Sequence, residues 1–264
     1  MQQVLRIVTL SERVHESREL VCDFDVTKAL RELTIPELLH MGVESLQGWE
    51  AVATLLQDSK TNSAGFCLNP KPHIQLGERF FAQQHGARRF VFCHELRHAY
   101  QALKGEWWKG YMLRRTAIVQ KGGEKLAQEW WKFLSPPLEV DAQEYALSKF
   151  PEEGSATVLN RSNEVVLELG KHPGATAHTF RSTVMLLPMV YEWRKLIEKQ
   201  RIVASSRGIV ASNAQYVLDF LARKTRAGSD KRVNSFCLQY LQAEPAEFLD
   251  IAERFFSYLL TLQD

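Results

Sequence analysis

Residues 90–101 read Phe-Val-Phe-Cys-His-Glu-Leu-Arg-His-Ala-Tyr-Gln and contain the pattern His-Glu-x-x-His within a run typical of one helix. On a helix, His94 and His98 stand one turn apart on the same face. Two imidazole nitrogens in that arrangement can reach a single Zn²⁺ ion at about 2.0–2.1 Å. The stretch therefore predicts a metal site carried by a helix.

Glu95 lies about 100° around this helix from His94, where it can reach water at a metal without being the obvious ligand. Zinc lowers the pKa of such water to roughly 7, and the Glu95 carboxylate can take its proton during attack on a carbonyl. The opposite side of the helix carries an apolar stripe formed by Phe92, Leu96, Ala99 and Leu103. This stripe predicts that the helix packs on a core while its polar face lines a cleft.

The composition is that of an ordinary globular protein of one large domain or two small ones. The chain has 264 residues, of which 45% are hydrophobic and 24% charged, and its net charge is +2. A balance so close to neutral gives no reason to expect a nucleic acid or an anionic membrane surface as a partner.

The cysteines and the apolar runs predict a cytoplasmic protein. The four cysteines are widely spaced and form no CxxC pair, which favours reduced thiols over disulfides or a cysteine zinc site. Cys93, beside the first histidine, is interpreted as a small buried core residue. The longest apolar runs, such as 184–190, are too short to span a membrane, and residues 1–14 do not resemble a secretory signal. A secreted effector without a classical signal is the alternative.

A small sheet is expected just before the motif helix. Residues 45–56 have helical spacing, whereas 65–68 and 73–76 predict two strands joined by a turn at Asn69-Pro70. An exposed edge strand beside a zinc helix can hold an extended peptide by backbone pairing. His73 and His85 are interpreted as surface residues and not as further ligands.

The third zinc ligand must come from elsewhere in the chain, because catalytic sites normally supply three protein ligands. The extended pattern HExxHxxGxxH is excluded, since Gln101 and Lys104 occupy its later positions. Residues 138–146 follow Pro136-Pro137 and predict a helix, on which Glu139 is the best candidate ligand and Asp141 the second choice.

Glu139 shares one face of that helix with two alanines and an amide. Ala142 and Ala146 would allow close approach to the motif helix. Gln143, one turn after Glu139, could form a hydrogen bond with a ligand histidine. The alternative is that Glu139 is a solvated acidic residue at a helix start, where the helix dipole favours negative charge in any case.

The two motifs together resemble those of the gluzincin metallopeptidases. His94-Glu95-x-x-His98 followed by Glu139-x-Asp141-Ala142-Gln143-x-Tyr145-Ala146 is similar to the compact bacterial and phage group of ImmA/IrrE-type proteins, and to uncharacterised bacterial metallopeptidases. The resemblance covers roughly residues 63–150. It implies a zinc ligand set of His94, His98 and Glu139, with Glu95 as general base. Gln143 stands where that group usually has Asp or Asn.

The C-terminal half predicts helices and no further motif. The expected helices are 175–199 with a bend near Pro188, 212–223, 234–241 and a last one through 260. Ser155 to Leu169 is polar with a short alternating patch. The basic residues between 223 and 232 are interpreted as a solvated loop. His172, His178 and Tyr191 are open candidates for stabilising a tetrahedral intermediate.

The sequence as a whole predicts an α+β, predominantly helical protein. We expect a zincin-like core with a small sheet before the motif helix, in a metallopeptidase domain at 1–150, and a helical region at 151–264 that is either separate or part of the same domain. The expected activity is hydrolysis of peptide bonds in a protein or peptide substrate, with one Zn²⁺ per chain at His94, His98 and Glu139 and with Glu95 as base. The alternative is a zinc-binding or regulatory interaction protein without catalysis. We expect no nucleic acid or membrane partner, and the sequence leaves the oligomeric state open.

Overall fold

A computed structural model of the chain describes residues 52–56, 64–67, 73–77, 83–104, 106–171, 184–228 and 231–261. The chain divides into two compact units, Met1–Trp108 and Lys109–Asp264, which are described separately below. The expected boundary near residue 150 stays a prediction.

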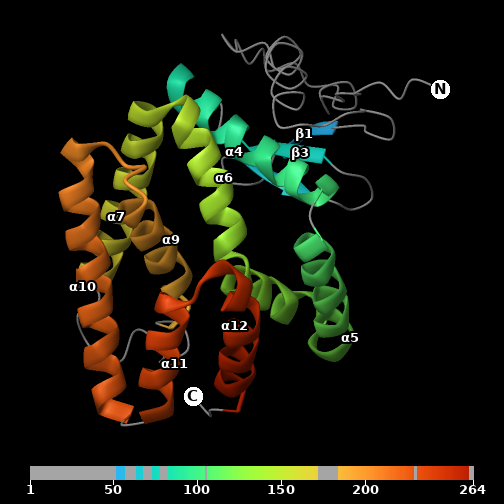
Figure 1. Ribbon diagram of the computed structural model, residues 1–264, viewed down its shortest axis with the longest axis vertical. Helices are drawn as coiled ribbons and strands as arrows, with labels where there is room; N and C mark the ends of the chain where they lie inside the picture. The colour runs from blue at the N-terminus through green and yellow to red at the C-terminus, as the bar shows by residue number, and fades with distance from the viewer. Residues whose placement is uncertain are drawn as a thin grey trace. The chain divides into compact units, whose positions relative to one another are not determined.

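A helix and a three-stranded sheet are the described parts of the first unit. The strands β1 (Val52–Leu56), β2 (Ala64–Cys67) and β3 (His73–Gly77) have the order β1-β3-β2. β1 runs parallel to β3, and β2 runs antiparallel to it. The motif helix α4 (His85–Lys104) packs against β2 and β3 (Figure 1).

These strands only partly follow the pattern in the sequence. The segments 65–68 and 73–76 overlap β2 and β3, whose antiparallel pairing fits a short connection through Asn69-Pro70. The expected helix at 45–56 is wrong at its C-terminal end, because Val52–Leu56 forms β1. The five residues Val-Ala-Thr-Leu-Leu are too few for their hydrophobic pattern to distinguish a helix from a strand. Pairing with β3 makes them a strand.

The second unit is helical, which confirms the predominantly helical character expected of the chain. Its helices are α5 (Glu106–Leu134, which begins in the first unit), α6 (Pro136–Lys149), α7 (Pro151–Lys171), α9 (Leu187–Glu198), α10 (Ala204–Gly228), α11 (Lys231–Gln242) and α12 (Pro245–Leu259). Among the described helices, none combines the length and apolar character that a membrane span requires.

Helix α5 is interrupted at Gly123. This residue has φ 78° and ψ −179°, a conformation that favours glycine because a side chain would be strained there. Gly123 therefore marks a kink between two helical stretches of α5.

Four helices form a ring of neighbours in the second unit. α6 packs against α7 and α9, and α10 packs against the same two helices (Figure 1). The backbone N–H of Val203 donates to Ser155 Oγ at 3.0 Å, and Asn213 donates to Ser162 Oγ at 2.8 Å. These bonds satisfy polar groups between the helices while the apolar side chains fill the centre. The buried apolar residues of these four helices include Val140, Ala146, Val158, Val190, Trp193, Val210, Ala214 and Val217.

Aromatic side chains form a second buried cluster near the C-terminus. The ring of Phe133 contacts those of Tyr240, Phe255 and Phe256. The Tyr240 hydroxyl donates to the carbonyl oxygen of Phe133, one of the last carbonyls of α5, which has no partner within the helix. The cluster therefore closes the end of α5 with α11 and α12.

The structure places two stretches of this half whose form the sequence left less certain. The polar stretch at 155–169 lies within α7, whose buried side is narrow and includes Ser155 and Ser162. Pro188 lies in the first turn of α9, where proline is tolerated because an N–H at the first helical positions has no partner within the helix. The part of the expected helix before residue 184 lies outside the described residues.

We predict that Tyr240→Phe lowers the free energy of unfolding by about 1 to 2 kcal/mol, because a buried carbonyl loses its hydrogen bond. Urea unfolding followed by circular dichroism measures this change. Tyr216→Phe, at a half-exposed position of α10, is the control and is expected to change stability by less. Equal effects of the two variants would contradict the role given to the Tyr240 hydroxyl.

Candidate metal centre

Helix α4 supplies the two histidines of the motif. Phe92 and Leu96 are fully buried, as expected of the apolar stripe, while the side chains of Ala99 and Leu103 lie outside the described residues. His98 is 7% exposed and His94 is half-buried. The helix thus holds both imidazoles on one side while its other side is anchored by burial.

The imidazole nitrogens of His94 and His98 converge on one point. Their Nε2 atoms are 3.1 Å apart, and the two rings meet edge to face with centroids 4.7 Å apart. Two nitrogens at 2.0–2.1 Å from one tetrahedral ion would lie about 3.3 Å from each other. The observed spacing fits a shared metal ion with almost no rearrangement of the helix.

Gln101 orients the second of these rings. His98 Nδ1 lies 2.8 Å from Gln101 Oε1, and both side chains are buried. Because the amide oxygen can only accept, Nδ1 carries the proton and Nε2 keeps its lone pair toward His94. Carbonyl acceptors of this kind commonly fix the tautomer of a metal-binding histidine.

Gln101 was missed as a partner of His98 in the sequence, where it served only to exclude a longer motif. The sequence spacing could have predicted this contact, because residues three positions apart on a helix are neighbours. The amide of Gln101 can therefore form a hydrogen bond with His98. Glu95, the expected base, is 8% exposed. A carboxylate buried to this degree beside two histidines is more typical of a functional site than of a surface helix.

Glu139 lies in the first turn of α6, as expected. Ser135 precedes the helix, Pro136 and Pro137 occupy its first positions, and the backbone N–H of Glu139 donates to the Ser135 carbonyl at 3.1 Å. The start of a helix stabilises a carboxylate through the helix dipole. The Glu139 side chain is half-buried.

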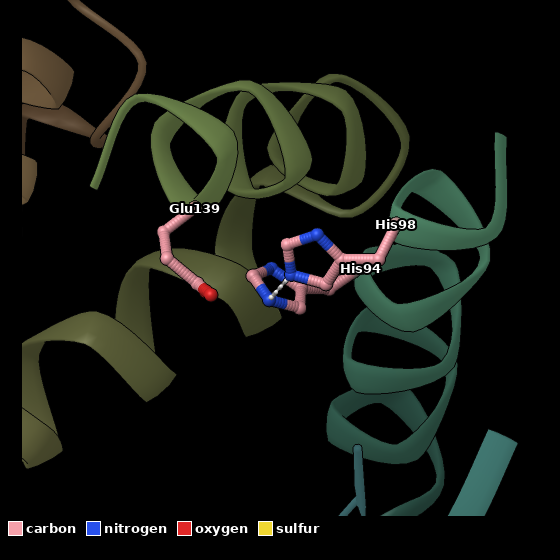
Figure 2. Close-up of side chains that lie close together, drawn as sticks. All are labelled: His94, His98 and Glu139. Atoms are coloured by element: carbon pink, nitrogen blue, oxygen red, sulfur yellow. Dashed lines mark hydrogen bonds between the residues drawn. The ribbon is translucent and has the colours of Figure 1, made fainter. Parts of the chain in front are cut away.

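One group of three side chains in the described part of the chain could hold a metal ion, and it is His94, His98 and Glu139. One ligand atom from each lies within 4.8 Å of the other two. Figure 2 shows the three side chains close together. Two imidazoles and one carboxylate are a donor set that zinc uses in hydrolytic sites and that leaves one position open. The donor set therefore fits a metal ion of this chemistry.

The other candidate residues have different roles or lie outside the description. Asp141 is half-buried on α6 and is not part of this group. Cys93 is a free cysteine with 1% exposure, as expected of a core residue. Tyr191 is buried, its hydroxyl donates to the Ala243 carbonyl at 3.1 Å, and burial raises its pKa, so its hydroxyl serves the fold. Nothing is described for the side chains of His73, His85, His172 and His178.

Gln143 has a partner that the sequence did not suggest. Its Nε2 donates to Glu192 Oε2 of α9 at 3.0 Å, and both side chains are buried. Its Oε1 is also buried and has no hydrogen-bond partner among the described residues. The expected hydrogen bond from Gln143 to a ligand histidine is thus not formed in this structure.

Comparisons with known protein families, with curated proteins and with solved structures give no match for this chain. The metal-binding donor set therefore stands on the motif and on the geometry alone.

We predict that Gln101→Leu weakens zinc binding about 10- to 100-fold, because the His98 ring loses the acceptor that fixes its tautomer. Competition with a chromophoric chelator measures the dissociation constant. Gln128→Leu, at an exposed position of α5, should leave it unchanged. A folded Gln101→Leu protein with the affinity of the wild type would contradict this role.

Proposed function

We propose that the protein is a zinc-dependent metallopeptidase that hydrolyses peptide bonds of a protein or peptide substrate. The grouping of His94, His98 and Glu139 carries the proposal, because it joins the two histidines of a His-Glu-x-x-His helix to a carboxylate 41 positions further along the chain. The resemblance to the gluzincins and a zincin-like core are parts of the same proposal.

The ligands would be His94 and His98 through Nε2 and Glu139 through a carboxylate oxygen. Zinc at such a site polarises a carbonyl and lowers the pKa of water to near 7. Glu95 is the residue that accepts the proton of the attacking water and later donates it to the leaving amine. Its burial removes competing bulk water, which favours proton transfer to and from the substrate alone.

The arrangement of the described strands supports an extended peptide as substrate. β3 is the central strand, so β1 and β2 each have an edge that no other described strand occupies. β2 also packs against α4, the helix that carries the histidines and Glu95. A peptide that adds to the β2 edge by backbone pairing would run beside this helix.

The alternative function is a zinc-binding interaction protein without catalysis. Such a protein needs the three ligands but no general base, whereas this chain carries Glu95 directly after the first histidine of the motif. The retention of a buried Glu95 therefore favours the peptidase. A cytoplasmic location remains part of the proposal, on the spacing of the cysteines, and the oligomeric state is left open.

Metal content tests the ligand set. We predict about one zinc per chain in the wild type and in Glu95→Gln, and a clear loss in Glu139→Ala, because only the last variant removes a ligand. Elemental analysis of the purified proteins measures this content. A wild-type protein that contains no zinc and takes up none would contradict both the peptidase and its non-catalytic alternative.

Cleavage of a peptide library tests the activity. We predict that the zinc-loaded wild type generates new N-termini, detected by mass spectrometry, and that Glu95→Gln lowers the rate about 100-fold or more because it removes the base. Glu164→Gln, an exposed position of α7, is the matched control and should cleave like the wild type. Zinc binding without any cleavage of the library would favour the non-catalytic alternative.

A further inference from the structure

Arg97 is the one charged residue of the His-Glu-x-x-His stretch to which the proposed mechanism gives no role. It follows His94 by three positions on α4, so the two side chains are neighbours on the helix surface, with Cβ atoms about 5–6 Å apart. A positive charge beside a ligand histidine opposes the binding of a metal cation. Metal binding therefore does not explain an arginine at this position.

The ring of Tyr100 restricts the Arg97 side chain. The guanidinium carbon Cζ of Arg97 lies 4.6 Å from the centroid of this ring, and both residues are half-buried. Tyr100 follows Arg97 by three positions, so His94, Arg97 and Tyr100 form one row along α4. A guanidinium held against an aromatic ring loses little conformational freedom when it binds a further partner.

The chemistry of this position suits a carboxylate. A guanidinium carries five N–H donors in one plane, so a single partner does not use them all, and two of them match the two oxygens of a carboxylate. Residues two positions apart on a helix do not face each other, so Glu95 and Arg97 leave α4 on opposite sides of His94.

α4 as a whole is positively charged. It contains one acidic residue, Glu95, and four basic residues, namely Arg88, Arg89, Arg97 and Lys104. An excess of positive charge along the helix that carries the two histidines raises the local concentration of anionic peptides. All of these residues belong to a single helix of the first unit.

We propose that Arg97 is a specificity-determining residue, which binds a carboxylate of the substrate close to the scissile bond. This inference rests on the proposed function. Arg97 lies within one helical turn, about 5.4 Å, of His94, and an extended peptide advances about 3.3–3.6 Å per residue. The carboxylate therefore belongs to a residue within about three positions of the scissile bond. It is the side chain of an Asp or Glu, or the C-terminus of the peptide.

The first test compares the cleavage of acidic and neutral peptides by the zinc-loaded protein. We expect the wild type to cleave peptides with the carboxylate about 10- to 100-fold more efficiently, in kcat/KM, than the same peptides with an amide in its place. Arg97→Gln should lose this preference through a higher KM for acidic peptides, and should cleave neutral peptides as before. Arg161→Gln, at an exposed position of α7, is the matched control and should keep the preference.

The source of the carboxylate is identified with two forms of one peptide library, with free and with amidated C-termini. Mass spectrometry locates the cleaved bonds in both. A preference for Asp or Glu at a fixed position in both forms identifies a side chain. A preference for bonds near the end of the peptide, lost on amidation, identifies the C-terminus.

A reversal of charge separates binding of substrate from a structural role of the Arg97–Tyr100 pair. We expect Arg97→Glu to disfavour acidic peptides and to favour Lys or Arg at the same position, because like charges repel and opposite charges attract. A purely structural role would lower cleavage of all peptides alike. Zinc affinity, measured by chelator competition, should be unchanged or higher in Arg97→Gln, because a positive charge beside His94 is removed.

The outcomes separate this inference from the proposed function. Equal cleavage of acidic and neutral peptides by the wild type would overturn the role of Arg97, and this measurement needs no variant to fold. A preference that persists in Arg97→Gln would lead to the same conclusion. The absence of zinc binding, or of any cleavage, in the wild type would instead remove the proposed peptidase itself.

Discussion

The approach of two imidazole nitrogens to 3.1 Å on α4 is the constraint on which the metal centre depends. A four-residue step along a helix places the rings one above the other, and burial of Phe92 and Leu96 holds the helix so that both rings face the same side. One helix face can offer these two ligands but no third at the right angle. A carboxylate for the candidate metal centre must therefore come from another helix, and Glu139 at the start of α6 is the one grouped with the two histidines.

The buried hydrogen bonds of Gln101 and Gln143 orient side chains more than they stabilise the fold. Gln101 gives its oxygen to His98, and Gln143 gives its amide hydrogen to Glu192, in both cases within 3.0 Å. Each buried polar group loses water, so the hydrogen bonds mainly offset that loss and add little net stability. These hydrogen bonds instead fix the orientation of the side chains, because an oxygen can only accept and an N–H can only donate. A metal ligand such as His98 needs a fixed ring orientation.

The helices of the second unit explain how Glu139 and Glu192 can be held firmly. α6 is one of four helices that pack in a ring with α7, α9 and α10, and its Ala142 and Ala146 are fully buried. The aromatic cluster around Phe133 and Tyr240 fixes the end of α5, directly before Ser135 and the start of α6. Glu139 thus lies in the first turn of a helix that is preceded by three buried residues, Phe133, Leu134 and Ser135.

The sequence by itself determined the features that depend on neighbours along the chain. The histidines of α4, the helix beginning at Pro136-Pro137 and Glu139 within its first turn all follow from spacing and from helix geometry, and Gln101 could have been found in the same way. Tertiary structure decided the rest. Val52–Leu56 became a strand through pairing with β3, and the polar stretch at 155–169 lies in a helix, α7, that packs against α6 and α10. The partnership of Gln143 with Glu192 joins residues 49 positions apart, and no local periodicity contains a contact that only helix packing creates.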